Sequence, residues 1–68
     1  MNVTPVVDGK NINLYSNGIK QTTIHGINSV GTPYTVGNNV IVQVKVGDNK
    51  PVTQQFDAKT GMYKTTLY

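Results

Sequence analysis

One stretch decides the fold: Val40-Ile41-Val42-Gln43-Val44-Lys45-Val46. Valine occupies every even position, and Gln43 and Lys45 occupy two of the odd positions between them. Because successive side chains of a β-strand point to opposite faces, this alternation predicts a half-buried strand with its four valines facing the core. We expect Ile41 to point outward, together with Gln43 and Lys45.

Two hairpins continue from this strand toward the C-terminal side. The segment Gly47-Asp48-Asn49-Lys50-Pro51 is typical of a hairpin connection, and a return strand is expected over residues 52–56. Asp57-Ala58-Lys59-Thr60-Gly61 fits a type I turn that closes on a left-handed glycine and forms a bulge. A last strand follows over residues 62–68. The sequence therefore predicts a C-terminal three-stranded meander.

The two faces of the last strand follow from the same alternation. If Tyr63 and Leu67 share the face that points to the core, then Met62 and Tyr68 point outward. Several large apolar side chains that point into solvent on the same part of the surface form a hydrophobic patch, and such patches usually mark an interface. We therefore expect Ile41, Met62 and Tyr68 to contribute to a contact with another protein subunit.

The N-terminal half supplies weaker strands, separated by single glycines and prolines. They are expected over residues 3–7, 11–15 and 19–24, with Asn17-Gly18 as a hairpin turn, a long connection over 26–33 and a short run at 34–36. Together the two halves give five or six short strands. We interpret residues 1–68 as a single all-β domain, either a small antiparallel barrel of SH3-like or OB-like type or a minimal Ig-like sandwich.

The stretch from Gly37 to Tyr68 also carries a resemblance. Its Gly-Asp-Asn-Lys-Pro hairpin and its Phe-Asp-x-x-Thr-Gly-x-Tyr turn resemble the C-terminal hairpins of bacterial and phage Ig-like modules. The resemblance covers less than half of the chain, and it implies a sandwich type of fold. It implies no functional residues.

The composition excludes most kinds of chemistry. The chain has no cysteine, so disulfides, thiolate ligands and thiol nucleophiles are all excluded. Its only histidine is His25, and its acidic residues are three aspartates in three separate turns, where such side chains usually bond their own backbone. We predict no catalytic residues, no metal, no cofactor and no enzymatic activity.

The net charge of +3 comes from six lysines and three aspartates. Small barrels that bind single strands combine a cationic groove with aromatic platforms, and Lys45, Lys59 and Lys64 with the four tyrosines are candidates for such contacts to an anionic ligand. The alternative to a structural role is thus a small cytoplasmic protein that binds single-stranded nucleic acid or inhibits a host enzyme. The absence of arginine, the usual reader of bases, counts against sequence-specific binding.

The favoured hypothesis follows from the small size of the chain. A domain of about 60 residues buries only about 60% of its unfolded surface, and oligomerisation is the stabiliser that remains when disulfides and metals are absent. Charged residues are only 13% of the chain, against about 25% in a typical domain, and Thr, Asn and Gln are abundant. We expect a non-enzymatic structural or interaction protein whose partners are protein subunits. The specific form we favour is a small phage virion component, such as a capsid auxiliary or decoration protein.

Localisation follows from the absence of a long apolar run. The longest uninterrupted one is Val40-Ile41-Val42, far shorter than a signal-peptide core or a membrane span. We expect synthesis in the cytoplasm without a signal peptide, no membrane partner, and a place in the virion if the favoured hypothesis holds.

Overall fold

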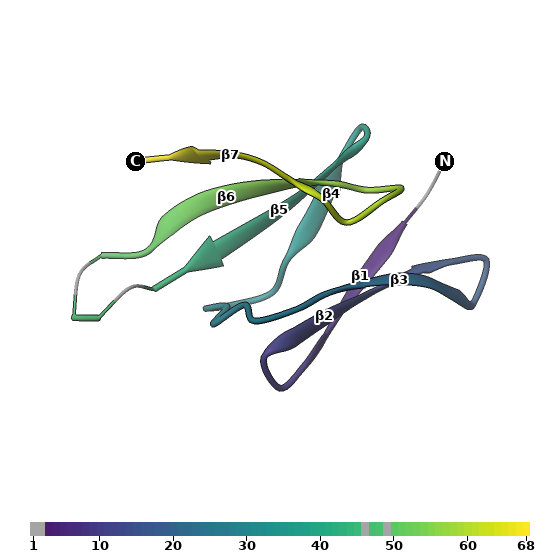
Figure 1. The fold of residues 1–68 in the computed structure, drawn as a ribbon, viewed down its shortest axis with the longest axis horizontal. Coiled ribbons are helices and arrows are strands. Elements are labelled where there is room, and N and C mark those ends of the chain that lie inside the picture. The colour runs from purple at the N-terminus through teal and green to yellow at the C-terminus, as the bar shows by residue number, and fades with distance from the viewer. Residues whose placement is uncertain (1–2, 46, 49) are drawn as a thin grey trace.

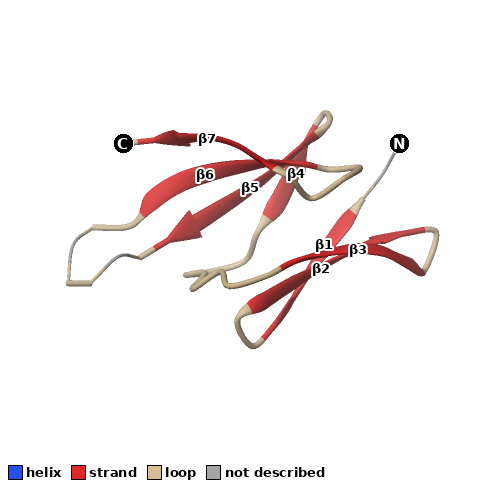
Figure 2. Ribbon diagram, in the orientation of Figure 1, coloured by secondary structure: helices blue, strands red, loops and turns tan. Residues whose placement is uncertain are grey.

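The structure is a computed structural model that describes residues 3–45, 47–48 and 50–68. Within these ranges the chain forms short antiparallel strands and no helix (Figure 2), which confirms the all-β class. Seven strands are present in the described ranges, so the expected number of five or six was too low. The short run at Tyr34–Val36 makes a ladder of its own with the strand that follows it, and it therefore counts as a separate strand.

The N-terminal half forms a three-stranded sheet in the order β1-β2-β3, with β1 at Thr4–Asp8, β2 at Asn11–Ser16 and β3 at Ile19–Ile24. The hairpin between β2 and β3 turns at Asn17 and Gly18, whose φ angles are 55° and 78°. Both residues tolerate positive φ, which explains why the Asn-Gly pair predicted this turn.

The C-terminal half forms a four-stranded sheet in the order β4-β5-β6-β7. Its strands are β4 (Tyr34–Val36), β5 (Asn39–Val44), β6 (Val52–Asp57) and β7 (Tyr63–Leu67). The predicted C-terminal meander is confirmed, with β5 inside the sheet and β4 added at the edge opposite to β7. The turn between β6 and β7 ends at Gly61 with a φ of 75°, as expected from its sequence.

The two sheets share one hydrophobic core, and they do not close into a barrel. They approach each other at β1 and β4, and in Figure 1 β7 runs along the upper edge while the three-stranded sheet lies at the lower right. Of the two architectures that were expected, a barrel or a minimal sandwich, the closed barrel is therefore wrong. The core consists of buried side chains from both sheets and their connections: Val3, Ile12, Leu14, Ile24, Ile27, Val40, Val42, Val44, Phe56 and Ala58.

The strand that decided the fold has the predicted inner face. Val40, Val42 and Val44 are buried at 0%, 1% and 8% exposure. Val46, the fourth valine of the predicted face, lies outside the described residues. The opposite face carries Asn39, Ile41 and Gln43, and Gln43 Nε2 donates a hydrogen bond of 2.6 Å to Thr53 Oγ1 on the neighbouring strand.

A bulge in the β6–β7 hairpin overturns the expected faces of the last strand. Tyr63 pairs with Phe56, but Thr65 pairs with Gln55, so β7 contains one extra residue, Lys64. A shift of one residue moves a side chain to the other face of a sheet. Tyr63 therefore lies on the face of Phe56, whereas Leu67 lies on the opposite face, next to Thr53. The prediction that Tyr63 and Leu67 share an inward face is wrong.

Candidate functional site

Four of the exposed large apolar side chains lie on β7 and the residues that flank it. Met62, Tyr63, Leu67 and Tyr68 are exposed at 68%, 57%, 52% and 103%. We call these four residues the β7 surface. β7 is an edge strand of the four-stranded sheet, and no other described strand pairs with its outer edge. The β7 surface therefore combines exposed apolar side chains with an unpaired strand edge.

Tyr63 marks the boundary between this surface and the core. It lies on the same face as the buried Phe56, but more than half of it is exposed. Its hydroxyl group is 2.5 Å from Thr66 Oγ1, which fixes the exposed end of the ring along the strand. The three-stranded sheet has one strand fewer than the four-stranded sheet, so the face of the outermost strand β7 remains accessible.

Lys64 connects β7 to its own sheet. Its Nζ donates a 2.6 Å hydrogen bond to Asn39 Oδ1 and lies 3.7 Å from Asp57 Oδ2. Asp57 in turn accepts hydrogen bonds from the backbone N–H groups of Thr60 and Lys59, at 3.0 and 2.8 Å. These backbone bonds, first that of Thr60, lower the pKa of Asp57, and the Lys64 ammonium group lowers it further. The only cation of β7 is thereby held against its own sheet.

The three residues expected at an interface have different outcomes. Met62 and Tyr68 are exposed, as expected, although the bulge changes the alternation from which this was predicted. Ile41 is buried at 8% exposure, so the expectation that it points into solvent is wrong. It lies on the outer face between its cross-strand partners Tyr34 and Gln55, whose long side chains flank it on an inner strand of the sheet. Sequence reasoning missed Leu67 because a bulge that no local signal positions turns it outward. It missed Tyr63 because this residue lies on the core face, as predicted, but at the exposed margin of that face.

A second group of exposed apolar residues lies where the two sheets meet. Val6 and Val7 on β1 and Tyr34 and Val36 on β4 are exposed between 42% and 55%. β1 and β4 contact each other at this place. This group therefore lacks the free strand edge that distinguishes the β7 surface.

The lysines considered for an anionic ligand are not brought together. Lys45 follows the Val44 end of β5, whereas Lys59 lies in the turn next to the Asn39 end of the same strand. Lys64 is the residue held by Asn39 and Asp57. The three side chains are exposed, but they do not line one groove.

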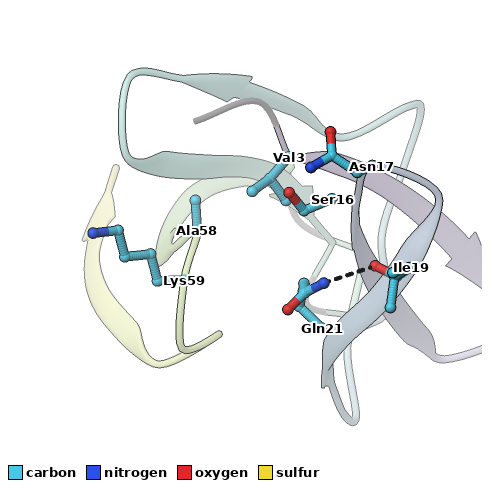
Figure 3. A pocket seen from close by; sticks show the side chains of 7 residues that line it. All are labelled: Val3, Ser16, Asn17, Ile19, Gln21, Ala58 and Lys59. Atoms are coloured by element: carbon cyan, nitrogen blue, oxygen red, sulfur yellow. Dashed lines mark hydrogen bonds between the residues drawn. The ribbon is translucent and has the colours of Figure 1, made fainter.

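A hollow of about 400 Å³ lies between the tip of the β2–β3 hairpin and the turn before β7 (Figure 3). Its walls are Val3, Ser16, Asn17, Ile19, Gln21, Ala58 and Lys59. Figure 3 shows the Lys59 side chain extending away from Ser16 and Gln21, and Gln21 Nε2 donates its hydrogen bond to the backbone oxygen of Ile19 at 3.2 Å. The polar groups therefore do not converge on one point in the hollow.

His25 has a simple structural partner. Its Nδ1 atom lies 3.2 Å from Asn11 Oδ1 on the exposed side of the three-stranded sheet. Ser16, the hydroxyl in the hollow, is at the other end of β2, so the histidine cannot act on it. Within residues 3–45, 47–48 and 50–68 there is no group of three or more metal-ligating side chains. In the same part of the chain, no helix has the length and apolar character needed to cross a bilayer.

No family model, no curated protein and no solved structure matches the chain.

Proposed function

We propose that this chain is a non-enzymatic structural protein that binds a protein subunit through the β7 surface. The observation that supports this proposal is the exposure of Met62, Tyr63, Leu67 and Tyr68 on one edge strand. Tyrosine and methionine are enriched at protein interfaces, where a large apolar body contributes contact area at a low entropic cost.

The area of the surface is consistent with this role. A tyrosine side chain offers about 150–250 Å² for burial, so Tyr68 and the exposed part of Tyr63 supply roughly 300 Å². Met62 and Leu67, both more than half exposed, bring the total to about 500 Å². Because Tyr63 and Leu67 lie on opposite faces of the sheet, this apolar area lies on both sides of the outer edge of β7, and exposed apolar area of this size is often functional.

The small core gives a physical reason for a partner. Its largest fully buried side chains are only Ile12, Leu14, Val40 and Val42, and the chain has no cysteine to strengthen it. A native domain of this size is stable by only about 5 kcal/mol, so burial of a further surface changes its stability substantially. Binding of a subunit at β7 supplies that burial.

The setting that we propose is a virion, with the chain as a capsid auxiliary or decoration protein. The support for this setting is the composition: few charges, and abundant Thr, Asn and Gln on exposed strands. Such a protein needs a sheet with one surface for the assembly and polar faces toward solvent. Both outer sheet faces carry polar pairs of this kind, the bonds between Gln43 and Thr53 and between Thr23 and Asn13.

The proposal is tested by the double variant Met62→Ser with Tyr68→Ser, made in cells that naturally produce the chain. The wild-type chain is expected to sediment with an assembly much heavier than its own 7.4 kDa, and the variant to sediment as the free chain. Both side chains are exposed, so the isolated fold stays intact, which circular dichroism checks.

The matched control is the double variant Ile19→Ser with Tyr34→Ser. These residues are exposed at 64% and 53%, but they lie on β3 and β4, away from the β7 surface. The control is expected to sediment with the assembly like the wild type. A β7 variant that remains in the assembly, or a control that is lost to the same degree, contradicts the proposal.

A further inference from the structure

The described strands have four edges, and three of them are protected against pairing with another chain. β1 and β4 contact each other where the two sheets meet, β1 contains Pro5, and β4 is only three residues long. The edge strand β3 carries Lys20 and meets the β6–β7 turn, where Gly61 lies against Thr22. Proline, short length, a charged side chain and coverage by another segment are the usual means of blocking a strand edge.

The fourth edge, β7, lacks these protections. Its five residues are Tyr63-Lys64-Thr65-Thr66-Leu67, with no proline or glycine among them. Its one charged side chain, Lys64, is held by Asn39 and Asp57 on the outer face of its own sheet. The strand is rich in β-branched and aromatic residues, which favour strand pairing.

We propose that β7 pairs with β7 of a second copy of this chain in an antiparallel ladder, which joins two four-stranded sheets into one continuous sheet. This inference rests on the proposed function and names the partner at the β7 surface. Two identical strands pair antiparallel about a two-fold axis perpendicular to the sheet, and the same residues then occur on both sides of the interface.

The order of residues along β7 suits such an axis. Beyond the bulge, Thr65, Thr66 and Leu67 pair regularly with β6, so this part of the strand is straight enough to continue the ladder. An axis near Thr65 or Thr66 places a threonine opposite its own copy, which is a favourable cross-strand pair. With the axis at Thr66, Leu67 of one copy lies opposite Thr65 of the other, and Tyr63 lies near Tyr68 of the other copy on the opposite face of the joined sheet.

Area and charge both favour a second copy as the occupant. Each copy offers about 500 Å² on the β7 surface, so a symmetric pair buries about 1,000 Å², the lower bound for a specific interface. Asp57 lies beside Lys64 and compensates its charge. The two Lys64 side chains therefore do not repel each other strongly when the two β7 strands pair. The other five lysines lie outside β7.

The test uses the absence of cysteine in the full chain. Residues that face their own copy across an antiparallel pair have Cα atoms about 4.5–5.5 Å apart, a separation that a disulfide spans. One of the variants Thr65→Cys and Thr66→Cys is therefore expected to form a covalent dimer readily under mild oxidation. Thr4→Cys is the matched control, since Thr4 is an exposed threonine on the edge strand β1.

Sedimentation equilibrium of the purified wild-type chain completes the experiment. Its apparent mass is expected to double from 7.4 kDa with rising concentration, and the variant Tyr63→Ser with Leu67→Ser is expected to stay at the monomer mass. Circular dichroism shows whether that variant is folded. If the Tyr63→Ser, Leu67→Ser variant is unfolded, the pairing of β7 is tested by the cysteine cross-links alone.

Three results overturn the inference. The first is a wild-type chain that remains monomeric, with no cysteine variant cross-linked above Thr4→Cys. The second is a dimer that cross-links only through Thr4→Cys, which places the contact at β1 and β4. The third is loss of the cellular assembly in the Met62→Ser, Tyr68→Ser variant while the purified wild type is monomeric. In that third case the proposed function stands with a different partner, and only the pairing with a second copy fails.

Discussion

The aromatic rings of Phe56 and Tyr63 pack edge to face, with their centroids 5.9 Å apart and their planes inclined by 74°. Phe56 is 5% exposed and Tyr63 is 57% exposed, so the hydrophobic core ends between these two cross-strand partners. One ring contributes to the stability of the fold, and the other presents most of its surface to solvent.

This difference predicts unequal effects on stability. Phe56→Ala removes a buried ring and should lower the free energy of unfolding by about 3–5 kcal/mol, close to the whole stability of a domain this small. Tyr63→Ala removes mainly the ring contact and should cost about 1 kcal/mol. Equilibrium unfolding in urea measures both values. Equal losses would show that Tyr63 belongs to the core.

The burial of Val44 predicts a second contrast, with its neighbour in sequence. Val44→Asp places an unpaired charge at a position that is 8% exposed, so the chain should fail to fold. Lys45→Asp introduces the same aspartate at the neighbouring, exposed position. This variant should alter the free energy of unfolding by less than about 0.5 kcal/mol. Circular dichroism and thermal melting check both variants. A folded Val44→Asp protein would mean that the valine face is not the core face.

Most of the strands could be predicted because their signals are local. The alternating valines of 40–44 fixed which face of β5 is buried, and Asn17-Gly18 and Gly61 occupy the positive-φ positions that their turns require. These features depend only on backbone sterics and on the period of a strand. They do not depend on the tertiary structure.

The faces of β7 could not be predicted, because the extra residue Lys64 is selected by tertiary contacts. Its ammonium group reaches Asn39, which is distant in the sequence, and the bulge that accommodates it reverses the alternation after Tyr63. The burial of Ile41 has a similar origin, since Tyr34 and Gln55 flank it only after three strands have paired. Of the three side chains that were expected to point outward, Met62 and Tyr68 are exposed and Ile41 is not; their place in an interface stays a prediction.

The turn before β7 predicts a contrast between two glycines of similar conformation. Gly61 and Gly18 have φ angles of 75° and 78°, so alanine at either position costs about 1–2 kcal/mol in backbone strain. At Gly61 a Cβ atom would also lie 3.2 Å from Thr22 Cγ2, whereas at Gly18 no described atom lies within 4 Å. Gly61→Ala should thus lower the melting temperature more than Gly18→Ala, and Lys59→Ala in the same turn should change it little. Equal melting temperatures for the two glycine variants would contradict the contact between the turn and β3.

The separation of the lysines predicts weak binding of single-stranded DNA. Lys45 and Lys59 lie at opposite ends of β5, and Lys64 is held by Asp57. We therefore expect only weak, non-specific association of a labelled oligodeoxythymidine at physiological salt, measured by fluorescence anisotropy. A submicromolar Kd, with a log–log salt slope of several times roughly −0.7, would show instead that several lysines contact phosphate together.

The network around Asp57 predicts how stability depends on pH. Backbone hydrogen bonds from Thr60 and Lys59, and then the charge of Lys64, lower the pKa of Asp57 from its ordinary value of 3.8 in the folded chain. The folded state therefore binds this proton less readily than the unfolded state. The carboxylate contributes its full stabilisation above the unfolded pKa of 3.8, and this contribution is lost as the pH falls through the lower folded pKa. Asp57→Asn retains an oxygen that can accept the turn hydrogen bonds, but it removes the charge beside Lys64. The variant should accordingly be less stable than the wild type at neutral pH, and the difference between their urea midpoints should shrink as the pH is lowered below 3.8. A difference that stays constant over this range would show that the charge of Asp57 contributes nothing to holding the β6–β7 hairpin and Lys64 in place.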